Sequence, residues 1–161
     1  MFVIWGKSSW SSPSDWPSIS SLPNISFGLL ITGSILNERI GFSVAGGCDL
    51  NNDHIDDLII GAGQINCLSS SPVFVLYGRN SASWPSQGII QTSEFDGVIG
   101  FKIIPDPNNL AAWTVDFGND PKCVGDYNGD GFNDILFGDR GSSTAVLVYG
   151  RATWPTIVTI T

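Results

Sequence analysis

Residues 126–138 read DYNGDGFNDILFG, an acidic loop that leads directly into a short apolar segment. Residues 49–61 read DLNNDHIDDLIIG and repeat the same order of loop and segment. The apolar segments of the chain are short, rich in Val, Ile and aromatic residues, and bounded by Gly, Pro, Asn, Asp or Ser, which is the pattern of β-strands. Because no segment shows a sustained 3.6-residue periodicity, an all-β fold is predicted.

A second unit occurs three times and consists of a β-branched run, an aromatic residue, a glycine and a basic residue. Its copies are FVIWGK, VFVLYGR and AVLVYGR, at Phe2–Lys7, Val73–Arg79 and Ala145–Arg151. A Trp-Pro pair follows each copy, namely Trp16-Pro17, Trp84-Pro85 and Trp154-Pro155. Four short strands per period of about 75 residues suit a propeller blade, which is a four-stranded antiparallel sheet stacked on its neighbours.

Two shorter units recur between these copies. Gly28–Thr32 is similar to Gly88–Thr92, and Ile40–Phe42 then matches Ile99–Phe101 in the same order. These matches align the start of one repeat with the start of the next. They also place a long insertion between Phe101 and the second acidic loop.

Side-chain oxygens occupy positions 1, 3, 5 and 9 of each acidic loop, and a backbone carbonyl is available at position 7. The set is Asp49, Asn51, Asp53, Ile55 and Asp57 in the first loop, and Asp126, Asn128, Asp130, Phe132 and Asp134 in the second. Hard oxygen donors with several negative charges are the ligands that Ca²⁺ requires. Asp-Asn-Gly clusters also form ordinary turns, but a turn does not need repeated carboxylates that repel one another. Two calcium sites are therefore predicted.

The residues at positions 4 and 6 differ between the loops. Gly129 and Gly131 in the second loop adopt positive φ without cost, whereas Asn52 and His54 stand there in the first. We therefore expect the first loop to bind calcium more weakly than the second.

Composition excludes several classes of function. The chain of 161 residues carries a formal net charge of −8 and has a sequence pI near 4.2. Such a field repels phosphates, so nucleic acid is not expected as a partner. Direct membrane insertion is not expected either, because the apolar runs are much shorter than the roughly 20 residues that a transmembrane helix needs. The one histidine, His54, lies inside an acidic loop, which leaves no catalytic triad to build and predicts a non-catalytic protein.

In these motifs the chain resembles the FG-GAP repeats of integrin alpha-subunit propellers and their bacterial and protist relatives. Gly41-Phe42 and Gly100-Phe101 resemble the FG element, Ser43–Ala45 the innermost strand, and Gly61–Gly63 the GAP element. The resemblance implies an extracellular β-propeller in which calcium rigidifies the loops between strands and other loops bind partners.

On this resemblance the chain divides into a half blade at residues 1–35, a blade with the first calcium loop at 36–98, and a blade with the second at 99–161. That makes about two and a half blades, and a closed propeller takes at least about four. The open faces and edges predict either a segment of a larger propeller or head-to-tail association of copies into a ring or filament.

The predicted function is a non-catalytic, calcium-binding structural or adhesion module, outside the cell or at its surface, with protein partners or copies of itself. The alternatives are a glycan-binding propeller, with Trp113 as its ligand contact, and an accessory domain of a secreted hydrolase. Asn24 begins a glycosylation sequon, Asn24-Ile25-Ser26. Cys48, Cys67 and Cys123 allow one disulfide in any of three pairings.

Overall fold

The computed structural model describes residues 1–6, 28–35, 38–63, 72–108 and 117–161. Within these ranges β-strands and turns dominate, with two short 3-10 helices and no α-helix. The strands are β1 (Phe2–Ile4), β2 (Gly28–Thr32), β3 (Ile40–Cys48), β4 (Asp57–Ala62), β5 (Val73–Leu76), β6 (Ile89–Gln91), β7 (Gly100–Pro105), β8 (Phe117–Gly125), β9 (Asp134–Asp139), β10 (Thr144–Val148) and β11 (Ile157–Ile160). The 3-10 helices are η3 (Ser81–Ser83) and η4 (Thr92–Glu94). The all-β prediction is confirmed.

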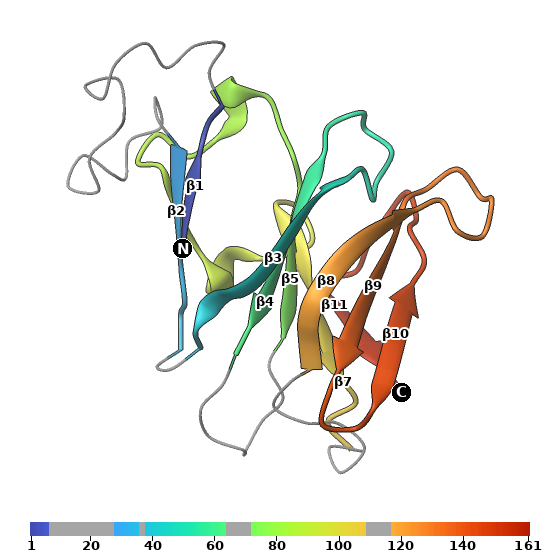
Figure 1. The fold of residues 1–161 in the computed structure, drawn as a ribbon. Coiled ribbons are helices and arrows are strands. Elements are labelled where there is room, and N and C mark those ends of the chain that lie inside the picture. Colours follow the sequence, from blue (N-terminus) through green and yellow to red (C-terminus); the bar gives the residue numbers. More distant parts are fainter. Residues whose placement is uncertain (7–27, 36–37, 64–71, 109–116) are drawn as a thin grey trace.

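Three sheets stand side by side in an open row (Figure 1). The N-terminal sheet has the strand order β1-β2-β6, the central sheet β11-β7-β5-β4-β3, and the C-terminal sheet β10-β9-β8. Neighbouring strands are antiparallel except for two parallel pairs, β2 with β6 and β7 with β11. Among the described strands, none of the three sheets closes on itself, so the number of blades and the closure of a propeller stay predictions.

The central sheet buries both of its faces. One hydrophobic core lies between it and the C-terminal sheet and includes Ile59 and Phe137. A second core lies against the N-terminal sheet and includes Leu29 and Phe74. All four residues of β5 are therefore buried. This double burial explains why the β5 sequence is continuously apolar and does not alternate.

The strand beside β5 is not the one that the sequence comparison predicts. β1 pairs with β2 so that Ile4 lies opposite Gly28, and β5 pairs with β7 so that Leu76 lies opposite Gly100. A Cβ atom on either glycine would collide with a carbonyl oxygen of the neighbouring strand. The structural counterpart of β2 is therefore β7, and the predicted equivalence of Gly28–Thr32 with Gly88–Thr92 is wrong.

The strands that follow Trp84-Pro85 and Trp154-Pro155 connect consecutive sheets. β6 adds a parallel strand to β2 of the N-terminal sheet, and β11 adds one to β7 of the central sheet. The backbone N–H of Leu30 donates to the carbonyl of Gly88 at 2.7 Å. Each of these two sheets thus receives an edge strand from a later part of the chain.

The beginning of the last repeat also differs from the expectation. Ile40 and Phe117 begin the first strands of the hairpins β3–β4 and β8–β9. The glycines that follow, Gly41 and Gly118, have φ values of 85° and 75° and precede a register shift. Phe117-Gly118 is therefore the counterpart of Ile40-Gly41, in place of Gly100-Phe101, because this position needs a glycine at positive φ.

This correction moves the boundary between repeats. β7 lies within residues 99–161, the unit assigned to the second calcium loop, yet it completes the central sheet. The expected boundary at residue 99 therefore separates two strands that pair with each other, β5 and β7.

A disulfide joins the first strands of two neighbouring sheets. Cys48 ends β3, and Cys123 lies in β8, with a Cα–Cα distance of 5.4 Å. This bridge selects one of the three pairings left open by the sequence. Cys67 lies outside the described residues.

Candidate metal-binding loops

The two acidic loops occupy the same place in two neighbouring sheets. The first connects β3 to β4 and the second connects β8 to β9, and both lie at the upper end of the sheets in Figure 1. Each loop joins the two strands of an antiparallel hairpin.

Side chains at positions 1, 3 and 5 of the first loop bind the loop's own backbone. The Asp49 carboxylate accepts hydrogen bonds from the N–H groups of Asp53 at 3.0 Å and His54 at 2.8 Å. Oδ1 of Asn51 accepts from the N–H of Asp53 at 3.2 Å. Oδ1 of Asp53 accepts from the N–H of Ile55 at 2.9 Å. The loop is therefore folded around its own acidic side chains.

The second loop repeats this arrangement position by position. The Asp126 carboxylate accepts from the N–H groups of Asp130 at 3.0 Å and Gly131 at 2.8 Å. Oδ1 of Asn128 accepts from the N–H of Asp130 at 3.1 Å. Oδ1 of Asp130 accepts from the N–H of Phe132 at 3.0 Å. The sequence repeat is thus a repeat of hydrogen bonding as well.

The aspartates at position 9 anchor each loop to the residues that follow β5 or β10. Asp57, which is 2% exposed, accepts from the N–H groups of Leu50 at 2.9 Å and Gly78 at 2.8 Å. Asp134, which is fully buried, accepts from those of Tyr127 and Gly150, both at 2.8 Å. Both carboxylates are thereby satisfied by backbone donors.

Burial also changes the acidity of the first of these carboxyl groups. Desolvation raises the pKa of Asp57 to about 6, and the hydrogen bonds from Gly78 and Leu50 act in the opposite direction. A positive charge nearby would favour the ionised form.

Sequence reasoning did not assign a role to the glycines of the Tyr-Gly-Arg units. A Cβ atom on Gly78 would collide with the carbonyl oxygen of Asp56, and one on Gly150 with that of Asn133. Glycine at these positions therefore brings the backbone close enough to donate to the buried aspartate. The signal was present in the sequence, since both the glycine and the aspartate repeat.

Both loops adopt positive φ at positions 4 and 6, although only the second loop has glycine there. Gly129 and Gly131 have φ values of 77° and 91°. The first loop holds Asn52 at 60° and His54 at 68° in the same left-handed region. A Cβ atom makes this conformation less favourable by roughly 1–2 kcal/mol, and this penalty is smaller for Asn than for most other residues. The His54 side chain is 88% exposed, and its Nδ1 lies 4.0 Å from Oδ2 of Asp49.

The donor chemistry of the loops suits a hard cation, although the acidic groups are not gathered around one point. In the part of the chain that the structure describes, no three His, Cys, Asp or Glu side chains form a group that could hold a metal ion. A carboxylate oxygen has more than one acceptor site, so the hydrogen bonds to the backbone leave capacity for a cation. The loops thus offer the right oxygens, and the sites stay a prediction.

The remaining predicted site residues are not placed. Trp113, the candidate ligand contact, and Asn24, the candidate glycosylation site, lie outside the described residues. Of the repeated tryptophans, Trp84 packs against Trp5 with ring centroids 5.6 Å apart, and Trp154 stacks on Phe101 at 4.2 Å. Both serve the packing of the fold.

Comparison with known protein families gives a match over part of the chain. Residues 40–65, which contain β3, the first acidic loop and β4, match the family model of the FG-GAP repeat. The resemblance stated from the sequence is thereby supported over this stretch. Comparison with curated proteins and with solved structures found no match. Among the described residues, no helix has the length and apolar character needed to cross a membrane.

Proposed function

We propose that the protein is a non-catalytic, calcium-stabilised structural module that acts in adhesion, outside the cell or at its surface. The observation that carries the proposal is the repeated loop, with the same acidic residues and the same backbone hydrogen bonds in two sheets. A fold that needed only a turn would not keep carboxylates at positions 1, 5 and 9 of both copies.

Calcium suits these loops better than magnesium does. Each loop offers three carboxylates, one amide oxygen and one backbone carbonyl, and the loop carboxylates at positions 1 and 5 repel each other without a cation. Asp130 and Asn128 would hold the ion in the second loop together with Asp126. Magnesium demands a small octahedron and retains its water, so a loop of flexible oxygen donors favours the larger ion.

Three observations support a location outside the cell. The Cys48–Cys123 disulfide belongs to oxidising compartments. Calcium modules with modest affinity are useful only where calcium is abundant, as in extracellular fluid. FG-GAP repeats, which residues 40–65 match, are typical of surface and extracellular proteins.

The chemistry of the chain favours a structural role over catalysis. The only histidine of the sequence is His54, whose side chain is almost fully exposed in the first loop. Asp57 and Asp134, two of the buried acidic groups among the described residues, accept hydrogen bonds from backbone N–H groups of their own loop and of the residues that follow β5 or β10. These aspartates hold the fold together, and we assign them no catalytic role.

Thermal unfolding with calcium, with magnesium and with a chelator tests this proposal. Calcium should raise the melting temperature more than magnesium does, and the Asp130→Ala variant should lose most of the gain at the second loop. Asp106→Ala removes an exposed carboxylate that binds the backbone of Asn108, away from both loops, and serves as the matched control. A melting temperature unchanged by the chelator would refute the proposal.

A further inference from the structure

The outermost sheets of the row each present one face that no described residue packs against. We call the outer face of the C-terminal sheet the C-face; it carries Leu136, Ala145, Leu147 and Tyr149. The outer face of the N-terminal sheet is the N-face, and it carries Phe2, Ile4 and Leu30. Of these residues, Phe2 is 42% exposed, Ile4 50%, Leu136 36% and Tyr149 46%.

The residues of the C-face match residues that are buried in the central sheet. Gly61 lies opposite Val73 and Gly138 lies opposite Ala145, which aligns β4–β5 with β9–β10. Val73 is fully buried against the C-terminal sheet, but its counterpart Ala145 is exposed. The C-face is therefore the type of surface that the next sheet covers inside the row.

The N-face stands in the same relation to the other side of the central sheet. The glycine pairings that align β1 with β5 make Phe2 the counterpart of Phe74 and Ile4 the counterpart of Leu76. Phe74 and Leu76 are 1% and 2% exposed and belong to the core that Met1 and Val3 also contact. The N-face is thus the type of surface that covers the preceding sheet.

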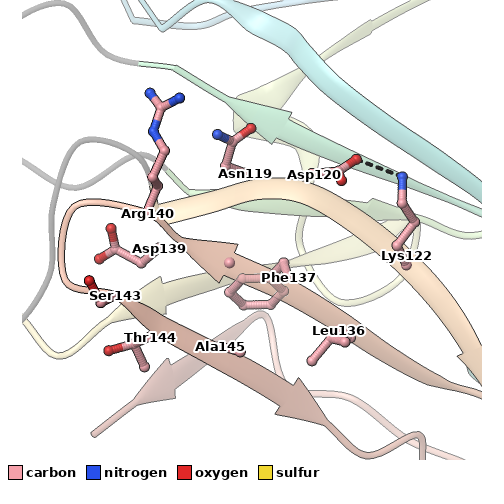
Figure 2. Close-up of a pocket in the computed structure, with 11 residues that line it drawn as sticks. Asn119, Asp120, Lys122, Leu136, Phe137, Asp139, Arg140, Ser143, Thr144 and Ala145 are labelled. Atoms are coloured by element: carbon pink, nitrogen blue, oxygen red, sulfur yellow. Dashed lines mark hydrogen bonds and ion pairs between the residues drawn. The ribbon is translucent and has the colours of Figure 1, made fainter.

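The C-face also contains a hollow of about 580 Å³ between β8, β9 and β10 (Figure 2). Leu136, Phe137, Gly138 and Ala145 line it together with polar residues that include Asn119 and Arg140. In the central sheet, the space above the corresponding glycine, Gly61, is filled by the Ser43 hydroxyl of the same sheet and by the Gly118 carbonyl of the following sheet. The space above Gly138 is open, with the Asn119 carbonyl 3.9 Å from a Cβ position.

We propose that the C-face of one copy of this chain binds the N-face of another, head to tail. The two faces are the two halves of an interface that the chain already makes twice between its own sheets. Met1 and Val3 pack in the core that holds Phe74 and Leu76. In the association, Ala145 and Leu147 correspond to Met1 and Val3, and they receive Phe2 and Ile4 of the second copy.

A second copy is the occupant because it carries the matching half of the interface. Each copy keeps one free face after binding, so the contact is heterologous and continues into a filament or closes into a ring. The row also leaves one edge of β10 without a partner strand among the described residues, and such edges favour association. This proposal does not depend on calcium binding.

Sedimentation and light scattering of two single-face variants test the proposal. Ala145→Asp blocks the C-face and Ile4→Asp blocks the N-face, and each should weaken self-association about tenfold or more by placing a charge in the contact. Val98→Asp is the control, since Val98 is 76% exposed and lies on neither face. It should associate as the unchanged chain does.

Mixing the two blocked variants gives the sharper result. Ile4→Asp keeps its C-face and Ala145→Asp keeps its N-face, so the mixture should form a one-to-one dimer and nothing larger. Formation of this dimer also shows that both variants are folded. A monomeric unchanged chain at every concentration overturns the proposal and leaves a sheet of another polypeptide as the occupant. A mixture that stays monomeric while the unchanged chain associates overturns the head-to-tail geometry.

Discussion

Removing the disulfide between Cys48 and Cys123 should lower the free energy of unfolding by about 4.5 kcal/mol. The bridge links residues 75 positions apart. A cross-link of this span restricts the unfolded chain, and the loop-closure relation gives about 4.5 kcal/mol at 25 °C for a loop of that length. For a chain of this size each kcal/mol shifts the melting temperature by roughly 2–4 °C, so we expect a decrease on the order of 10 °C.

The double variant Cys48→Ala/Cys123→Ala is the perturbation of choice. Cys48 is fully buried, and alanine avoids placing an unsatisfied hydroxyl in the core. Urea unfolding followed by tryptophan fluorescence, with and without a reductant, measures the change. The reductant should destabilise the unchanged chain and leave the double variant as it is. Equal stability of the oxidised chain and the double variant would refute the reasoning about chain entropy.

Three further variants test the loop backbone and the core. In calcium-free buffer, His54→Gly should stabilise the fold by about 0.5–1 kcal/mol because the relief of positive φ exceeds the entropy cost of glycine, and Gly131→Ala should destabilise it. Urea unfolding of both variants decides this, and changes of the same sign would contradict it. Phe101→Ala should cost about 3–5 kcal/mol because the ring is buried and stacked on Trp154. The exposed Val98→Ala control should stay within about 0.5 kcal/mol in the same assay, and an equal loss in both variants would argue against the stacking.

The candidate loops were predictable because their chemistry is local. Every second residue from Asp126 to Asp134 supplies an oxygen of the second loop, and this spacing can be read without a structure. The positive φ values of Asn52 and Gly129 follow from the same local reading. The role of Gly78 was not predicted, because its partner, Asp57, lies 21 residues earlier and only the pairing of β4 with β5 brings them together.

The equivalence of the repeats was harder to read from the sequence. Gly28 and Gly88 begin similar segments, but strand pairing makes Gly28 the counterpart of Gly100. Short apolar strands easily resemble one another in sequence by chance, since few residue types suit a buried strand. The decisive property was the close approach of a neighbouring backbone, which becomes visible only once the strands are paired.

The sequence by itself determined that the chain is made of short β-strands, that it repeats, and that two acidic loops recur at matched positions. These features depend on residues close together in the chain, where propensity and spacing act directly. The tertiary structure alone decided which strands share a sheet, which cysteines pair, and which apolar faces no other described residue covers. Such features depend on contacts between distant residues, as when β11 joins β7 or Cys48 meets Cys123. Local sequence does not specify these contacts, because many strands are compatible with the same edge.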